Sequence, residues 1–204
     1  AAFKPLVDRI ADTDIRLQWF CCDRSTGVTD ASGNRITLIR DTQSPVAVEY
    51  QAVKFIGTGR DNIKAGVFSG WELGDYIYLR SEEAYMIKME ALAHKGSAEA
   101  VTELNSFMKT RQPDYNYTFT NKADLIEEII YQKRVEFWGE GLEYIDNRRL
   151  NIPVDRTDET WGAENNNHFS AGKFRYNQED RPFLYQLPLS EIENNSQLSP
   201  SDQN

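Results

Sequence analysis

Two glutamates whose spacing suits acid–base chemistry lie in the C-terminal half of the chain. Glu136 and Glu140 are four residues apart, so a helix would place them on one face. Pairs of carboxylates are what glycosidases use, one as the acid and one as nucleophile or base. The other interpretation is a buried salt-bridge network, which we favour because a catalytic acid needs an apolar pocket instead of nearby cations. The cations close in sequence are Arg134, Arg148 and Arg149.

Aromatic side chains are the second set of candidates, because their faces can stack on sugar rings at low entropy cost. Trp161 and Tyr176 lie in a polar stretch near the C-terminus, and Trp71 and Trp19 lie upstream. The alternative is that each ring packs its own loop against helices, and Trp138, inside a helical pattern, suits the core. Donors that sugar hydroxyls need accompany the first two rings: Asn165, Asn166, Asn167 and Arg175.

A long amphipathic stretch, residues 122–150, must position the two glutamates. Its apolar residues recur at helical spacing, so one face is buried. Asn121 is a good N-cap, and Arg148 and Arg149 stand in the last turn, where the helix dipole favours cations. Pro153 prevents the helix from continuing. The stretch therefore predicts one helix.

Two glycines interrupt this predicted helix. Gly139 and Gly141 each cost about 1 kcal/mol relative to Ala at an interior position. A helix accepts that cost where a backbone or a large ring comes close, or where it kinks. We therefore expect a bend or break at most near these glycines, with Arg134 and Glu136 substantially buried and paired.

A helix pair is predicted upstream, at residues 75–96 and 98 to about 111. Gly96 suits the position after a helix, and Ser97 suits the cap of the next one. This αα-hairpin resembles a tetratricopeptide unit, which cannot bury both faces alone. Its predicted inner residues are Ala84, Ile87, Lys88, Ala91 and Leu92, followed by Ala100, Val101, Leu104, Phe107 and Met108.

The remaining stretches predict short strands and loops. Residues 12–20 fit a short strand or a helix equally well. The glycines near residue 58 are not followed by a helical pattern, which argues against a phosphate cradle. Strands are predicted at 36–38, 46–50 and 183–188, a loop with aromatic anchors at 155–180, and an extended tail at 190–204.

Composition and charge exclude several functions. A net charge of −9 argues against nucleic-acid binding, and no apolar run of 18 residues is present that could span a membrane. Cys21 and Cys22 are adjacent, which disfavours a structural disulfide between them. His94 and His168 are isolated, so the spacing of metal ligands is missing and we expect no cofactor.

Three stretches carry motifs in a fixed order: the stretch from Tyr78, residues 134–149, and the stretch from Leu187 onward. Together they resemble the SusD/RagB family, the surface nutrient-binding lipoproteins of Bacteroidetes. The chain departs from the family's C-terminal signature at Gln132, Lys133 and Glu143. Stretches from Tyr78 and from Leu187 onward resemble two further motifs, so the resemblance covers residues 75–204 well. The signature is matched at Arg134, Glu136, Glu140, Gly141, Asp146 and Arg149.

The resemblance implies a mainly α fold, a SusD-like tetratricopeptide-type helical scaffold with long loops and a few short strands. It also implies that Asp14 and Arg16 form an Asp–Arg pair before an extended segment. Family members are usually much longer than this chain. We therefore expect residues 1–204 to be a single C-terminal SusD/RagB-like domain of a longer protein, whose lipid anchor is not on this chain.

The function that the resemblance implies is polysaccharide utilisation at the cell outer membrane. A surface-exposed lipoprotein would bind an oligosaccharide, or a peptide, without cleaving it and deliver it to a SusC-like TonB-dependent transporter. The candidate ligand contacts are Trp161, Tyr176, Trp71 and Arg175, and the signature residues are structural. A helical protein-interaction module without glycan binding is the alternative, and a two-carboxylate glycosidase comes third.

Overall fold

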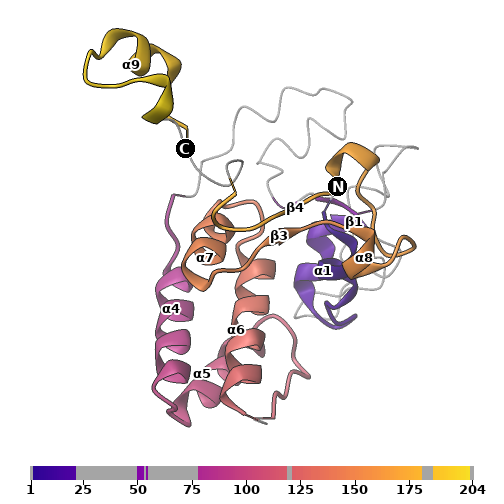
Figure 1. Ribbon diagram of the computed structural model, residues 1–204. Coiled ribbons are helices and arrows are strands. Elements are labelled where there is room, and N and C mark those ends of the chain that lie inside the picture. Colours follow the sequence, from indigo (N-terminus) through magenta and orange to yellow (C-terminus); the bar gives the residue numbers. More distant parts are fainter. Residues whose placement is uncertain are drawn as a thin grey trace, which may run out of the picture. The chain divides into compact units, whose positions relative to one another are not determined.

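The described part of the chain is mainly helical and its strands are very short (Figure 1), which confirms the predicted fold class. The computed structural model describes residues 2–21, 50–52, 54, 78–118, 121–180 and 186–202. These residues belong to two units, Ala1–Glu140 and Gly141–Asn204. The organisation of residues 1–204 as one domain stays a prediction. Trp71 and most of the predicted strands at 36–38, 46–50 and 183–188 lie outside the described residues.

Helices α4 (Ser81–His94), α5 (Glu99–Met108) and α6 (Lys122–Glu136) are the longest helices described in the first unit. Helix α4 contacts both others, and Figure 1 shows α4 and α6 side by side. Removing their apolar side chains from water is what drives this packing. The buried apolar residues are Met86, Met89 and Ala93 of α4, Ala100, Leu104, Phe107 and Met108 of α5, and Leu125, Ile129, Ile130, Tyr131 and Val135 of α6.

The helix ends follow the predicted cap residues. Gly96 has a φ of +71°, and the N–H groups of Gly96 and Ser97 donate to carbonyls in the last turn of α4 at 2.9 and 3.0 Å. These are the two hydrogen bonds of a Schellman motif. At the start of α6, the Asn121 side chain accepts the N–H of Asp124 at 3.0 Å. The local sequence therefore determines where these helices begin and end.

The buried face of α4 differs from the predicted one. Of the five predicted inner residues, Leu92 is half-buried and the others are exposed, with Ile87 52% exposed. The face that packs is Met86, Met89, Glu90 and Ala93. The apolar periodicity of this face is interrupted in the sequence by Glu90, a charged residue at a buried position. Glu90 accepts a hydrogen bond from Lys133 on α6 at 3.3 Å.

The N-terminal segments pack around an apolar cluster of their own. Helix α1 (Lys4–Asp8) and the 3-10 helix η1 (Ile15–Trp19) lead into β1 (Phe20–Cys21), which pairs antiparallel with β2 (Gln51–Ala52). Residues 12–20 thus contain a 3-10 helix and the first residue of a strand, so both alternatives that the sequence left open are present. Trp19 and Trp138 both pack against this cluster, so neither is a free stacking surface. Its buried members are Ala2, Val7, Ile10, Leu17, Phe20, Tyr50, Tyr131 and Val135.

The predicted single helix over residues 122–150 is broken at the two glycines. Helix α6 ends at Glu136 and α7 (Leu142–Leu150) begins after Gly141. Gly139 and Gly141 have φ values of +77° and +86°, a region that residues with a Cβ rarely adopt. A Cβ on Gly141 would meet nothing within 4 Å. Both glycines are therefore explained by their backbone conformation, and at Gly141 close packing is not the reason.

The second unit combines α7 with short elements in the stretch predicted to be loop. Strands β3 (Val154–Asp155) and β4 (Arg175–Tyr176) pair antiparallel, with Val154 opposite Tyr176. Between them lie helix α8 (Asp158–Trp161) and the 3-10 helix η4 (Ser170–Gly172). The predicted extended tail is wrong in part, because α9 (Leu189–Asn194) and η6 (Pro200–Asp202) are helical. Pro188 and Pro200 fix φ values that suit the start of a helix.

Candidate functional site

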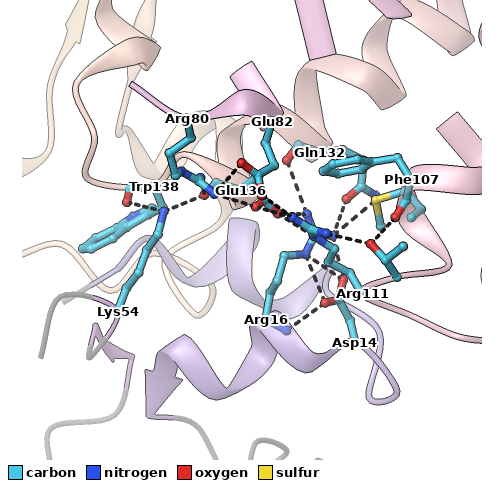
Figure 2. A network of polar contacts seen from close by, with 12 residues as sticks. Asp14, Arg16, Lys54, Arg80, Glu82, Phe107, Arg111, Gln132, Glu136 and Trp138 are labelled. Carbon is cyan, nitrogen blue, oxygen red and sulfur yellow. Dashed lines mark hydrogen bonds and ion pairs between the residues drawn. The ribbon is translucent and has the colours of Figure 1, made fainter. Parts of the chain in front are cut away.

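Glu136 is the centre of a charged network in the first unit. Its side chain is 1% exposed and lies at the end of α6, where three guanidinium groups converge on it (Figure 2). Arg80 and Arg111 approach within 3.0 Å and Arg16 within 3.4 Å. These arginines come from segments far apart in sequence, so the carboxylate ties together the N-terminal part, the start of α4 and the end of α5.

Arg16 is as deeply buried as Glu136, and the predicted Asp–Arg pair is present. Asp14 caps η1 by accepting the backbone N–H of Arg16 at 2.8 Å, and it also accepts the guanidinium at 2.7 Å. A second guanidinium contact reaches Gln132 Oε1 on α6 at 2.5 Å. A buried charge is tolerated when it is paired and hydrogen-bonded in this way.

Glu140 extends the network beyond the end of α6. It accepts Arg80 Nη2 at 2.9 Å and Lys54 Nζ at 2.5 Å. Lys54 also donates to the backbone carbonyls of Glu136 and Trp138, at 2.5 and 3.2 Å. The last carbonyls of a helix lack partners within it and carry partial negative charge, so a cation is favourable there. Glu140 thus meets Arg80 together with Glu136 even though it lies outside the helix.

The electrostatics of Glu136 are those of a structural anion. Burial by itself raises the pKa of this carboxyl, but the hydrogen bond from Arg111 and the positive charges of Arg16 and Arg111 outweigh burial, so the pKa lies below its ordinary value. A catalytic acid needs the opposite shift. The structure supports the salt-bridge interpretation but gives Glu136 other partners than the predicted ones, with Arg134 half-buried two residues away on α6.

The signature residues of the second unit contribute a turn and a local pair. Gly141 supplies the left-handed backbone that precedes α7. Asp146 is buried and pairs with Arg149 at 2.7 Å, one turn along the same helix. Arg148 donates to the carbonyl of Gln178 at 2.6 Å, which ties α7 to the chain after β4. These contacts fit the structural role that the resemblance implies.

Two predicted ligand contacts, Trp161 and Arg175, meet at Asp155 in the second unit, and Tyr176 lies next to Arg175 on β4. The Trp161 indole donates to the Asp155 carbonyl at 3.0 Å, and Arg175 Nη1 lies 2.9 Å from Asp155 Oδ2. Tyr176 lies on the strand that pairs with Asp155 and Val154, and its ring centroid is 4.7 Å from that of Phe174. The sequence spacing did not reveal the approach of Arg175 to Asp155, because the antiparallel pairing of β3 with β4 creates it, whereas Trp161 is six residues from Asp155 along the chain.

Asp155, Trp161 and Arg175, here called the Asp155 cluster, hold one another in place, and the Trp161 and Arg175 side chains stay accessible. The Asp155 side chain is 10% exposed, whereas that of Arg175 is 52% exposed, and Trp161 as a whole is 37% exposed. Burial tends to raise the pKa of Asp155, but hydrogen bonds from Thr160 and Thr157 lower it below the ordinary value. The ionised Asp155 carboxylate therefore fixes the Arg175 cation, and the backbone carbonyl of the same residue fixes the Trp161 ring.

The neighbouring asparagines have different roles. Asn166 is buried and donates to the Arg156 carbonyl at 2.9 Å and to Asp158 at 2.8 Å, so its amide holds the loop together. Asn165 and Asn167 are exposed. Sequence reasoning missed Phe169, which is 76% exposed in the same loop. No sequence signal separates an exposed ring from a packed one in a stretch of mixed polar and aromatic residues.

Among the described residues, no three His, Cys, Asp or Glu side chains are grouped as metal ligands would be. None of the helices described here is long and apolar enough to cross a membrane.

The described residues form a mainly helical protein in which a buried ion network around Glu136 holds the segments of the first unit together. The model of the SusD family matches residues 50–204, which is most of the chain, and the chain therefore belongs to that family. It is similar to the crystal structure of a SusD-like carbohydrate binding protein from Bacteroides vulgatus ATCC 8482, with a TM-score of 0.59 and 21% identity. The match covers 95% of this chain and 40% of that one. No curated protein matches the chain.

Proposed function

We propose that this chain contributes to the capture of an oligosaccharide at the outer-membrane surface, for delivery to a SusC-like TonB-dependent transporter, without cleaving it. Membership of the SusD family and the likeness to a protein described as carbohydrate binding support the class of function. The observation that carries the proposal to particular residues is the Asp155 cluster, where Trp161 and Arg175 are fixed and accessible together.

The chemistry of the cluster suits sugars. An aromatic face covers the apolar C–H face of a sugar ring, while guanidinium and carboxylate groups exchange hydrogen bonds with hydroxyls. Binding groups on a loop that a scaffold positions lose little freedom on binding. The non-enzymatic reading is supported by Glu136, which is enclosed by arginines and has a lowered pKa, unlike a proton donor.

The test is a glycan array followed by calorimetric titration of the best ligand. The double variant Trp161→Ala with Tyr176→Ala should bind at least about tenfold more weakly, since each stacked ring contributes on the order of 1 kcal/mol. The circular-dichroism signal of the helices should not change. Trp161→Phe, which keeps a ring but loses the indole hydrogen bond, should lie between the double variant and wild type.

A matched control is Tyr78→Ala, which removes a 92% exposed aromatic ring outside the cluster and should leave the affinity unchanged. Unchanged affinity in the double variant would remove the Asp155 cluster as the binding surface. Release of shorter sugars by the wild-type protein would overturn the non-enzymatic proposal and return Glu136 and Glu140 as candidate catalysts.

A further inference from the structure

The first unit contains a cavity of about 300 Å³ that sequence reasoning did not predict. It is formed by the turn after α1, the loop after α5 and the middle of α6. Its volume falls at the lower end of small-molecule sites. The side chains that matter for its chemistry are Arg9, Gln112, Tyr115, Tyr117, Glu128 and Tyr131.

Glu128 is the polar centre of the cavity lining. Its side chain is 13% exposed and accepts Arg9 Nη2 at 2.6 Å, the Tyr115 hydroxyl at 2.8 Å and Gln132 Nε2 at 2.7 Å. A carboxylate has about four acceptor positions, one more than these described donors use. The carboxylate is therefore held in one orientation while it can still accept a hydroxyl from a ligand.

Arg9 and two tyrosines supply donors and ring faces. The Arg9 guanidinium lies 3.9 Å from the centroid of the Tyr131 ring, so a cation–π contact and the pairing with Glu128 fix it together. Burial raises the pKa of the Tyr115 and Tyr131 hydroxyls, which therefore keep their protons in neutral and mildly alkaline solution. A guanidinium has five N–H donors, more than the contact with Glu128 requires.

The loop that closes the cavity is held by α5. Asn105 accepts the backbone N–H of Tyr117 at 2.7 Å and donates to the Tyr117 carbonyl at 3.0 Å. At the other side of the loop, Thr13 donates to Asp114 at 2.6 Å. These contacts link the loop to two other segments, so the cavity is largely formed before any ligand arrives, which lowers the entropic cost of binding.

Charge balance selects the ligand class. Arg9 compensates Glu128, and Arg16 compensates Asp14, which also lines the cavity. Neither an anion nor a cation therefore meets an uncompensated opposite charge. A neutral ring with several hydroxyls can donate to Glu128, accept from Arg9 and Gln112, and lie against tyrosine faces. We propose that this cavity binds a single neutral sugar ring, separately from the Asp155 cluster.

The choice of a sugar among neutral polyhydroxyl ligands rests on the proposed function, but the site does not depend on the Asp155 cluster. The probes are D-glucose, D-galactose and N-acetyl-D-glucosamine, each titrated into the ¹⁵N-labelled chain. At least one should produce saturable shifts in the backbone amides of residues 9–14, 112 and 114–117, at roughly millimolar affinity.

Two variants test the role of the Glu128 charge and the need for the cavity volume. Glu128→Gln keeps the shape but removes the charge, and should weaken sugar binding about tenfold, because hydrogen bonds to charged groups are the stronger ones. Its control is Glu99→Gln at the start of α5, a residue that does not line the cavity and whose side chain is 56% exposed. Ala11→Leu places a larger side chain in the half-buried lining without removing a polar contact, and should abolish the shifts.

The outcomes separate this proposal from the previous one. Shifts at the cavity that survive Trp161→Ala and vanish in Ala11→Leu would establish a distinct sugar site. Oligosaccharide binding that depends on Trp161, with no saturable shift at residues 9–14 for any of the three probes, would overturn the cavity proposal alone. Equal affinity in Glu128→Gln and wild type would overturn the assigned chemistry.

Discussion

Glu136 in the first unit and Asp155 in the second are both carboxylates that hold several donors, but the exposure of their cationic partners differs. The side chains of Arg16, Arg80 and Arg111 around Glu136 are 1%, 17% and 20% exposed. Arg175 beside Asp155 is 52% exposed. Buried pairs lose much stability when one partner is removed, whereas exposed pairs contribute little and leave their atoms available to a ligand. The same residue types therefore serve the fold in one region and can serve recognition in the other.

The largest expected effect is that of Glu136→Ala. Removing the carboxylate leaves Arg16 buried without one of its partners, which should lower the free energy of unfolding by about 3–5 kcal/mol. Urea unfolding followed by circular dichroism measures the change, with Glu127→Ala on the exposed side of α6 as control. A soluble Glu136→Ala variant with the wild-type melting temperature would show that the network does not hold the fold.

Protonation of Glu136 by acid should weaken the same network without shortening the side chain. The folded-state pKa of Glu136 lies below its ordinary value of 4.5, so its stabilisation is complete above that value and is lost as the pH falls through the lower folded-state pKa. Stability of the wild type should therefore fall from about pH 5 downward. Glu136→Gln cannot titrate and should show a shallower fall. Parallel curves for the two proteins would assign the acid sensitivity to other carboxyls.

The signature glycine should matter through its backbone and not through packing. Gly141→Ala should destabilise by about 1–2 kcal/mol, because an L side chain at a φ of +86° is strained even where space is open. In Gly172→Ala the new Cβ would lie 3.5 Å from the Phe169 ring, an ordinary contact, so this control should change stability little. Equal effects in thermal melts would contradict the conformational explanation.

The smallest expected effect is that of Arg175→Ala on stability. An ion pair with a half-exposed partner contributes about 0–1 kcal/mol, so urea unfolding should barely change. The free energy of oligosaccharide binding, measured by calorimetry, should weaken by clearly more than the free energy of unfolding of this variant decreases. A loss of stability close to that of Glu136→Ala would end the distinction between a structural cluster and an accessible one.

Sequence patterns predicted local features where the cause is local. Asn121 caps α6 and Gly96 ends α4 because each depends on the conformation of a few neighbouring residues. The inner face of α5 followed from periodicity, since Ala100, Leu104 and Met108 are all buried. Periodicity failed for α4, where Glu90 occupies an inner position that is acceptable because Lys133 pairs with it from another helix.

The partners of the charged residues were likewise not predictable from the sequence, because they lie far away along the chain. The sequence singled out Glu136, Glu140 and the Asp14–Arg16 pair, but proximity in sequence suggested partners that are not the ones around Glu136. Arg80 and Arg111 reach it only because α4, the end of α5 and α6 pack together. Likewise, Trp161 and Arg175 were candidates from their residue types, but the pairing of β3 with β4 is what brings Arg175 to Asp155, whose carbonyl also accepts the Trp161 indole.

The sequence by itself therefore determined the helical class, the cap residues, the glycine break and the types of residue that could recognise a sugar, because these depend on backbone preference and side-chain chemistry. The tertiary structure decided which charges are paired, which rings are exposed and where a cavity exists. Those properties depend on the distances between residues far apart in the chain, as between Arg9 and Glu128, and packing alone determines such distances.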